Sequence, residues 1–131
     1  MTCPWPIAIA VVALITGCME IGGGGSVHIP PASVTAGQPV TLELELTAVG
    51  GANGRFANVR CIYWTDGGTG ARSLLMDEVG PTELGTKFSV KLPPSEKAGW
   101  VRYYFRFDFD GQSKDRGSVQ QPFEIVVTNA T

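Results

Sequence analysis

Apolar and polar residues alternate one by one along four stretches of this chain, and this alternation constrains the fold more than any other feature. The stretches are residues 40–46, 87–92, 101–110 and 123–127. Successive side chains of a β-strand point to opposite faces, so each stretch predicts a strand with one buried and one solvated face. Less regular patterns predict strands over residues 59–64 and 72–76, and a short edge strand over residues 27–30, which prolines limit.

Residues that favour turns separate the predicted strands. The turn candidates are Ala36-Gly37-Gln38, residues 50–54, residues 66–70, Gly80-Pro81, Pro93-Pro94 and Asp110-Gly111. Turns at intervals of roughly eight to twelve residues, with no helical period after Cys18, are typical of antiparallel β-sandwiches. We therefore predict an all-β fold, an antiparallel sandwich of about seven strands, over residues 27–131.

The order and spacing of these stretches resemble the immunoglobulin-like and fibronectin type III-like domains of bacterial extracellular proteins. The matching stretches are residues 31–42, 59–67, 88–93, 101–104 and 108–111. The resemblance implies an immunoglobulin-like β-sandwich. It does not imply a function, because this fold carries many unrelated ones.

The N-terminus differs in character from the rest of the chain. Residues 1–19 carry no charge, and all charged side chains fall between Glu20 and Glu124. The apolar run of residues 7–15 is shorter than the roughly twenty residues that a membrane-spanning helix needs, and its length suits the apolar core of a secretory signal. We therefore expect residues 1–17 to be a signal peptide.

The residues that follow this run are Ile15-Thr16-Gly17-Cys18. They resemble the lipobox of bacterial lipoproteins, and the resemblance implies cleavage before Cys18 and attachment of palmitate-like acyl chains, which anchor the protein to the membrane. An unmodified Cys18 beside an uncleaved N-terminal helix is the alternative. Met19 stands where an Asp would resemble an inner-membrane retention signal, so the resemblance implies a cell-envelope location at the outer membrane where the cell has two membranes.

Glycines and small residues follow Cys18. The segment 21–26 has the composition of a flexible tether, so we expect residues 18–26 to link the lipid to the folded domain. Cys3 would leave with the signal peptide and Cys18 would carry lipid, which leaves Cys61 without a disulfide partner. Cys61 shares the inward side of its predicted strand with Val59 and Tyr63, so we expect a buried, inert thiol rather than a reactive one.

Few residues could support catalysis. His28 is the only histidine, and no nucleophile motif surrounds it, so a catalytic triad has no base and zinc lacks ligands. No glycine-rich phosphate loop opens a helix, and a net charge of −2 with a pI near 5.3 disfavours nucleic acid as a partner. We predict that the protein is not an enzyme and uses no cofactor or metal.

Two groups of carboxylates have spacings that could suggest a calcium site or a glycosidase pair. The residues are Asp108, Asp110 and Asp115, and the pair Glu43 and Glu45. The first group departs from the spacing of a calcium loop and fits a strand end that leads into a solvated turn. The second is separated by about 7 Å along one strand face, as in inverting glycosidases, but the alternation with threonine fits a solvated outer face.

The outer face of two predicted strands interleaves arginines with apolar and aromatic side chains. This candidate binding face comprises Arg60, Ile62, Trp64, Arg102, Tyr104 and Arg106. Trp, Tyr and Arg are enriched in binding hot spots, so the face suits recognition of a partner. The simpler alternative is a cation–π ladder satisfied within the chain, or burial of Trp64 and Ile62 beneath the loop near residues 77–85.

Two functions of different class follow. The first is a lipid-anchored, non-catalytic module that binds an envelope protein. The second is a carbohydrate-binding module in which Trp64, Tyr104 or Trp100 stacks on sugar rings. A planar row of exposed aromatics would favour sugar, and an apolar patch with a charged rim would favour protein.

Overall fold

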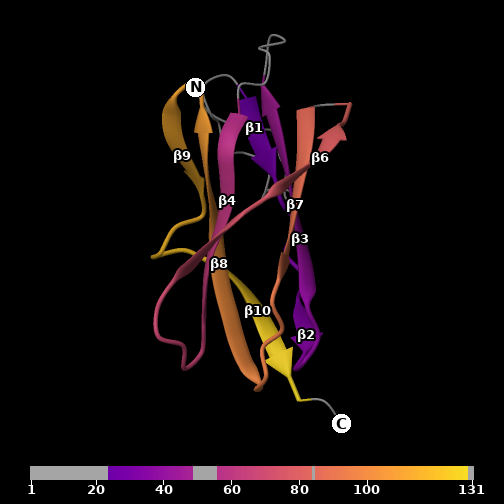
Figure 1. Ribbon diagram of the computed structural model, residues 1–131, viewed down its shortest axis with the longest axis vertical. Coiled ribbons are helices and arrows are strands. Elements are labelled where there is room, and N and C mark those ends of the chain that lie inside the picture. Colours follow the sequence, from indigo (N-terminus) through magenta and orange to yellow (C-terminus); the bar gives the residue numbers. More distant parts are fainter. Residues whose placement is uncertain (1–23, 49–55, 84, 130–131) are drawn as a thin grey trace, which may run out of the picture.

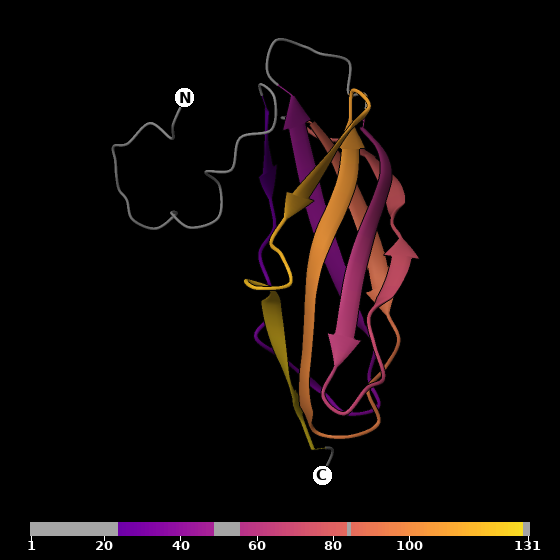
Figure 2. The same ribbon diagram turned by 90° about the vertical axis from the view of Figure 1, so that its left-hand side faces the viewer.

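Ten β-strands arranged in two facing sheets make up the part of the chain that the computed structural model describes, residues 24–48, 56–83 and 85–129 (Figures 1 and 2). These residues contain no helix, and so none that could cross a membrane. The predicted all-β sandwich is therefore confirmed. The proposed signal peptide, residues 1–17, and the part of the proposed tether from Cys18 to residue 23 lie outside the described residues.

The two sheets have the strand order of an immunoglobulin-like domain. One sheet contains β1 (Gly24–Val27), β3 (Val40–Ala48), β7 (Gly85–Leu92) and β6 (Asp77–Pro81) in that order. The other contains β2 (Ser33–Thr35), β10 (Phe123–Thr128), β8 (Gly99–Phe109), β4 (Phe56–Thr65) and β5 (Arg72–Leu75), and β9 (Gln112–Arg116) also pairs with β8. These sheets correspond to the A-B-E-D and G-F-C-C′ sheets of that fold. Among the strand pairings of the described residues, the β2–β10 pairing alone is parallel.

Three of the ten strands, β2, β6 and β9, go beyond the seven expected from the alternation. All lie at sheet margins, and their residues are mostly exposed, so neither face had to be apolar. Gly80-Pro81, expected to be a turn, belongs to β6, where an irregular register between Glu78 and Gly80 bends the edge. Asp110-Gly111 is a turn as expected, and positive φ angles of 51° and 82° make it the tight hairpin that leads into β9.

β1 begins at Gly24 and so includes the last three residues of the proposed tether, whereas of the expected edge strand 27–30 only Val27 belongs to it. Gly24 pairs with Ala48, and the Gly25 amide donates a hydrogen bond of 2.9 Å to the Thr47 hydroxyl oxygen. Backbone pairing with β3 needs no large side chain, so the glycine-rich composition did not prevent a strand here. Ser26 is buried as part of this pairing edge.

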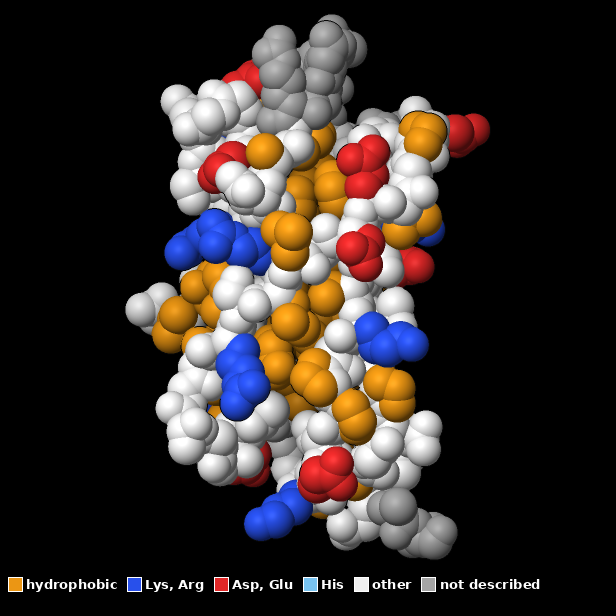
Figure 3. Space-filling view, in the orientation of Figure 1, with side chains coloured by type: hydrophobic (Ala, Val, Ile, Leu, Met, Phe, Trp, Pro, Cys, Tyr) orange, Lys and Arg blue, Asp and Glu red, His pale blue; other side chains and the backbone are white. Residues whose placement is uncertain are grey.

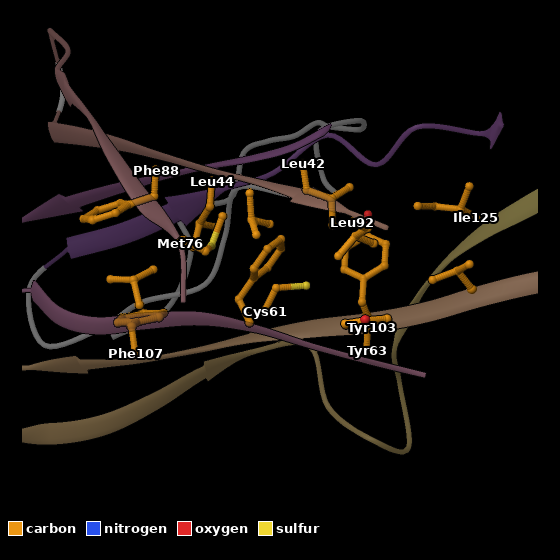
Figure 4. Close-up of a cluster of buried hydrophobic side chains, with 14 of the residues drawn as sticks. Leu42, Leu44, Cys61, Tyr63, Met76, Phe88, Leu92, Tyr103, Phe107 and Ile125 are labelled. Atoms are coloured by element: carbon orange, nitrogen blue, oxygen red, sulfur yellow. The ribbon is translucent and has the colours of Figure 1, made fainter. Parts of the chain in front are cut away.

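The core lies between the inward faces of the two sheets. Its residues are Leu42, Leu44, Leu46, Val59, Cys61, Tyr63, Met76, Phe88, Val90, Leu92, Val101, Tyr103, Phe105, Phe107, Phe109, Ile125 and Val127. Figure 4 shows side chains of β3 and β7 pointing toward those of β4 and β8. The alternation predicted this inward set on all four regular strands. An additional residue, Asn58 at φ 52°, forms a bulge that lets both Phe56 and Val59 face inward.

Candidate functional site

The six residues of the candidate binding face lie side by side on the outer surface of β4 and β8. In this antiparallel pair Arg60 lies opposite Arg106, Ile62 opposite Tyr104, and Trp64 opposite Arg102. The residues that alternate with them are buried in the core. Of the six residues themselves, Tyr104 is also buried. The sequence pattern therefore placed these six residues correctly on one surface.

Tyr104 is 6% exposed, so its ring is not available in the way the sequence suggested. The chain between β9 and β10 packs over it, and a Cβ added to Gly117 would come within 3.0 Å of the Tyr104 Cβ. The Trp64 ring meets the Tyr104 ring edge-on, with centroids 6.3 Å apart. The expectation that residues 77–85 cover this face is wrong, because β6 belongs to the opposite sheet.

Arg102 is held in place by two neighbours on this face. Its Nε donates a hydrogen bond of 2.8 Å to Glu124, which lies opposite it on β10. Its guanidinium carbon lies 3.9 Å from the centroid of the Trp100 ring. This part of the surface is therefore the self-satisfied cation–π arrangement that the simpler alternative predicts.

Arg106 and Arg60 differ in their environment although they lie opposite each other. Arg106 donates hydrogen bonds of 2.9 and 3.2 Å to the two carboxylate oxygens of Asp115, and these bonds and the negative charge raise the pKa of Arg106. Its guanidinium also lies 5.7 Å from the Tyr104 ring centroid. The buried Nε of Arg60 has no hydrogen-bond partner among the described residues. Arg102 and Arg106 thus have carboxylate partners within the chain, whereas Arg60 has a buried Nε without a hydrogen-bond acceptor among the described residues.

Three exposed aliphatic side chains extend this face. Leu75, 69% exposed, lies opposite Arg60 on β5, and Val126, 48% exposed, lies opposite Trp100 on β10. Val119, 60% exposed, belongs to the chain between β9 and β10. Figure 3 shows a different surface, the edge of the sandwich where the chain crosses from β5 to β6, on which apolar side chains lie between charged groups.

Two hollows adjoin Trp64. The sheet-face hollow, about 460 Å³, is lined by Trp64, Arg102, Val119, Gln120, Pro122 and Glu124. The loop-end hollow, about 700 Å³, lies between the β4–β5 loop and the β7–β8 loop, with Trp64 and Trp100 among its lining residues. Trp64 borders both, so it connects the candidate binding face to the end of the sandwich.

The carboxylates considered for calcium make other interactions. Asp108 accepts a hydrogen bond of 2.8 Å from the Asn58 amide nitrogen, and Asp115 pairs with Arg106. Across residues 24–48, 56–83 and 85–129, no three potential metal ligands gather at one point.

Glu43 and Glu45 are also engaged separately, as expected for a solvated strand face. Glu43 lies 3.6 Å from the ammonium group of Lys87, which is on the neighbouring strand β7. Glu45 accepts a hydrogen bond from the Thr82 hydroxyl. Neither carboxylate lines the sheet-face hollow or the loop-end hollow.

His28 is a core residue rather than a surface base. Nδ1 lies 2.6 Å from the Glu43 carbonyl oxygen, and Nε2 lies 2.6 Å from the Tyr103 hydroxyl oxygen. Burial lowers the pKa of His28 and the nearby charge of Arg116 lowers it further, while the bond to the Glu43 carbonyl opposes both. The imidazole is therefore neutral at physiological pH, with its polar atoms used inside the fold.

Cys61 is fully buried and free, as the sequence predicted. Burial raises the pKa of the thiol to about 12. A thiol in this state carries almost no thiolate near neutral pH, so it contributes packing rather than chemistry.

The three exposed aliphatic residues and the loop-end hollow were not part of the predicted face. Leu75 and Val126 lie in strands whose alternation could have indicated their outward direction. Val119 and the two loops lie in irregular segments, and no periodic pattern in the sequence assigns them to this surface.

Comparison with known proteins gives no family assignment. No protein-family model matches the chain, and no curated protein matches it significantly in sequence. The fold is thus defined by the strand order, and the function has to be argued from the residues of the site.

Proposed function

We propose that this chain is a lipid-anchored cell-envelope protein whose β-sandwich acts without catalysis by binding another envelope protein. The anchor is supported by the lipobox-like residues ending at Cys18 and the uncharged, apolar segment before them. Binding is supported by the composition of the outer face of β4 and β8.

The observation that carries the proposal is the clustering of exposed aliphatic side chains around this face. Leu75, Val119 and Val126 are three of the five large apolar residues that the described chain leaves exposed, and all three border the same surface. Half-buried Ile62 and Trp64 lie between them on β4, next to the ion-paired Arg102 and Arg106 of β8. Aromatic and apolar side chains interspersed with arginine are enriched in protein interfaces.

Arg60 adds a requirement on the partner. It lies between the positive Arg106 and the exposed Leu75, and none of the ion pairs formed by the described residues includes its guanidinium. A carboxylate on the partner, next to an apolar side chain that covers Leu75, would complement this position. We therefore expect the partner to present an acidic residue here.

The binding face is tested by crosslinking in intact membranes, followed by mass spectrometry of the captured protein. Leu75→Ser and Arg60→Ala should each weaken capture of one specific partner roughly tenfold, as expected for hot-spot residues of an interface. Val79→Ser is the matched control, because Val79 is 60% exposed but lies on β6 in the other sheet. Equal capture by all four proteins would refute the assignment of this face.

The anchor is tested separately by Cys18→Ala. The variant should leave the detergent-extracted membrane fraction or accumulate as an uncleaved precursor, because one thiol would carry the lipid. Cys3→Ala is the control, since Cys3 belongs to the segment that cleavage removes. Membrane fractionation and migration of Cys18→Ala identical to wild type would rule out lipidation at this position.

Carbohydrate binding is the second candidate, and it depends on a different part of the surface. Tyr104 is buried and cannot stack on a sugar, so the planar row of exposed aromatics that sugar binding at the sheet face would need is not formed. Trp64 and Trp100, however, both border the loop-end hollow.

A further inference from the structure

The loop-end hollow is set between two loops at one end of the sandwich. One loop joins β4 to β5 and includes Asp66 and Thr69, and the other joins β7 to β8 and includes Glu96 and Lys97. Trp64 and Trp100 come from the adjacent ends of β4 and β8, where the Asp66 amide donates a hydrogen bond of 3.0 Å to the Trp100 carbonyl oxygen.

The lining of this hollow differs chemically from the sheet face. It contains no Leu, Ile, Val, Met or Phe side chain, and its larger apolar surfaces are aromatic. The remaining side chains supply carboxylate acceptors, cationic donors and hydroxyls. Aromatic surfaces next to carboxylates, cations and hydroxyls suit a ligand that carries many hydroxyl groups and has flat apolar faces.

Both loops are held in shape by the chain itself. The Gly68 amide donates a hydrogen bond of 3.0 Å to the Thr65 carbonyl oxygen, and Gly67 adopts a φ of 81°, which closes a tight turn. In the other loop, the Ser95 carbonyl oxygen accepts a hydrogen bond of 2.7 Å from the Gly37 amide, and two prolines precede it. A site formed in advance loses less conformational freedom when a ligand binds.

The position of the hollow also suits a ligand outside the membrane. β1 begins at the opposite end of the sandwich from the β4–β5 and β7–β8 loops, as the register of β1 on β3 and the direction of β4 show (Figure 1). The eleven residues of β8 connect the two ends, a length of about 36 Å. If the chain is anchored at Cys18, a step that rests on the proposed function, the loop end faces away from the lipid.

We propose that the loop-end hollow binds a glycan of β-linked pyranose units, with Trp64 and the side of the Trp100 ring that Arg102 does not cover stacking on the sugar rings. Asp66 and Glu96 accept hydrogen bonds from sugar hydroxyls, and Lys97 donates to ring substituents. This site lies apart from Leu75 and Arg60, so one molecule can hold a glycan at its end and a protein at its sheet face.

The test uses the full-length protein purified in detergent, titrated with cellohexaose and with chitohexaose by isothermal calorimetry and tryptophan emission. We expect saturable binding of at least one of them, weakened roughly tenfold or more in Trp100→Ala. Glu96→Gln should weaken binding without disturbing the fold, because Glu96 is exposed. Glu78→Gln, an exposed glutamate on β6, is the matched control and should bind as wild type.

Three outcomes would overturn the glycan site. They are no binding of either oligosaccharide to the folded wild type, equal binding by wild type and both hollow variants, or loss of the crosslinked protein partner in Glu96→Gln with no glycan bound. The last result would assign the hollow to the protein interface. Failure of the anchor or of the sheet-face interface would appear in Cys18→Ala or Leu75→Ser and would leave the glycan titration unaffected.

Discussion

The Nε2 nitrogen of His28 lies 2.6 Å from the hydroxyl oxygen of Tyr103, and this contact joins the two sheets within the core. The Glu43 carbonyl can only accept, so Nδ1 of His28 carries the proton and Nε2 accepts a hydrogen bond from Tyr103. The edges of the Phe105 and Phe123 rings enclose the imidazole, with centroids 4.7 and 4.9 Å away. Antibody domains join their sheets with a disulfide, whereas a neutral polar pair serves here.

Removing the Tyr103 hydroxyl should destabilise the domain. Tyr103→Phe leaves the buried Nε2 of His28 without a donor, which we expect to lower the free energy of unfolding by about 1–3 kcal/mol. Urea unfolding followed by far-UV circular dichroism measures this change. Tyr63→Phe is the control, because the Tyr63 hydroxyl makes no hydrogen bond among those described, and an equal loss in both variants would contradict the role of the pair.

Acid should destabilise the protein through His28. Its pKa in the folded state lies below the unfolded value of about 6.5, so the unfolded chain takes up the proton first as pH falls. Stability should be constant above about pH 7 and should decrease below pH 6.5 by up to about 1.4 kcal/mol per pH unit. Urea unfolding between pH 5 and 8 measures the slope. His28→Leu should abolish it in this range, since the chain has one histidine, and a slope retained in that variant would assign the effect elsewhere.

Cys61 should be unreactive until the protein unfolds. The rise of its pKa from 9.0 to about 12 lowers the thiolate fraction near neutral pH about a thousandfold, and the side chain has no access to solvent. Iodoacetamide should therefore label the peptide that contains Cys61 only in urea. Mass spectrometry of that peptide gives the extent of labelling, and rapid labelling without denaturant would show that the thiol is accessible.

Gly85 should be the less replaceable of two glycines. A Cβ at Gly85 would overlap the carbonyl oxygen of Leu46 on the paired strand, so Gly85→Ala must move the backbone, at an expected cost of about 2–3 kcal/mol. Gly37→Ala is the comparison, because Gly37 has open space around it and only a positive φ of 86°, which costs about 1 kcal/mol. Thermal unfolding should rank the two variants in this order, and the reverse order would contradict the close approach of β7 to β3.

The sequence was most informative where a strand has one face in the core and one in solvent. Leu42, Phe88 and Phe107 all face inward as their alternation predicts, because burial of one face imposes a period of two. β6 is exposed on both faces, and β9 is a run of polar residues that are exposed or half-buried, so neither has the alternation that distinguishes a strand from a loop.

The same limit applies to the site. The alternation placed Trp64 and Arg102 on the outer face of their strands, because burial of the residues between them determines which side faces outward. The burial of Tyr104 depends on Gly117, which is distant in the sequence and belongs to an irregular segment. A contact of this kind is a property of the assembled fold and has no local pattern.

The parallel pairing of β2 with β10 bears on when the domain can fold. Val34 lies opposite Val127, so one of the first strands made has its neighbour among the last residues of the chain. Pairings this distant in sequence close slowly, since the intervening loop must lose its freedom first. A chain still emerging from a ribosome therefore cannot complete its second sheet until residues 126–128 are available to pair.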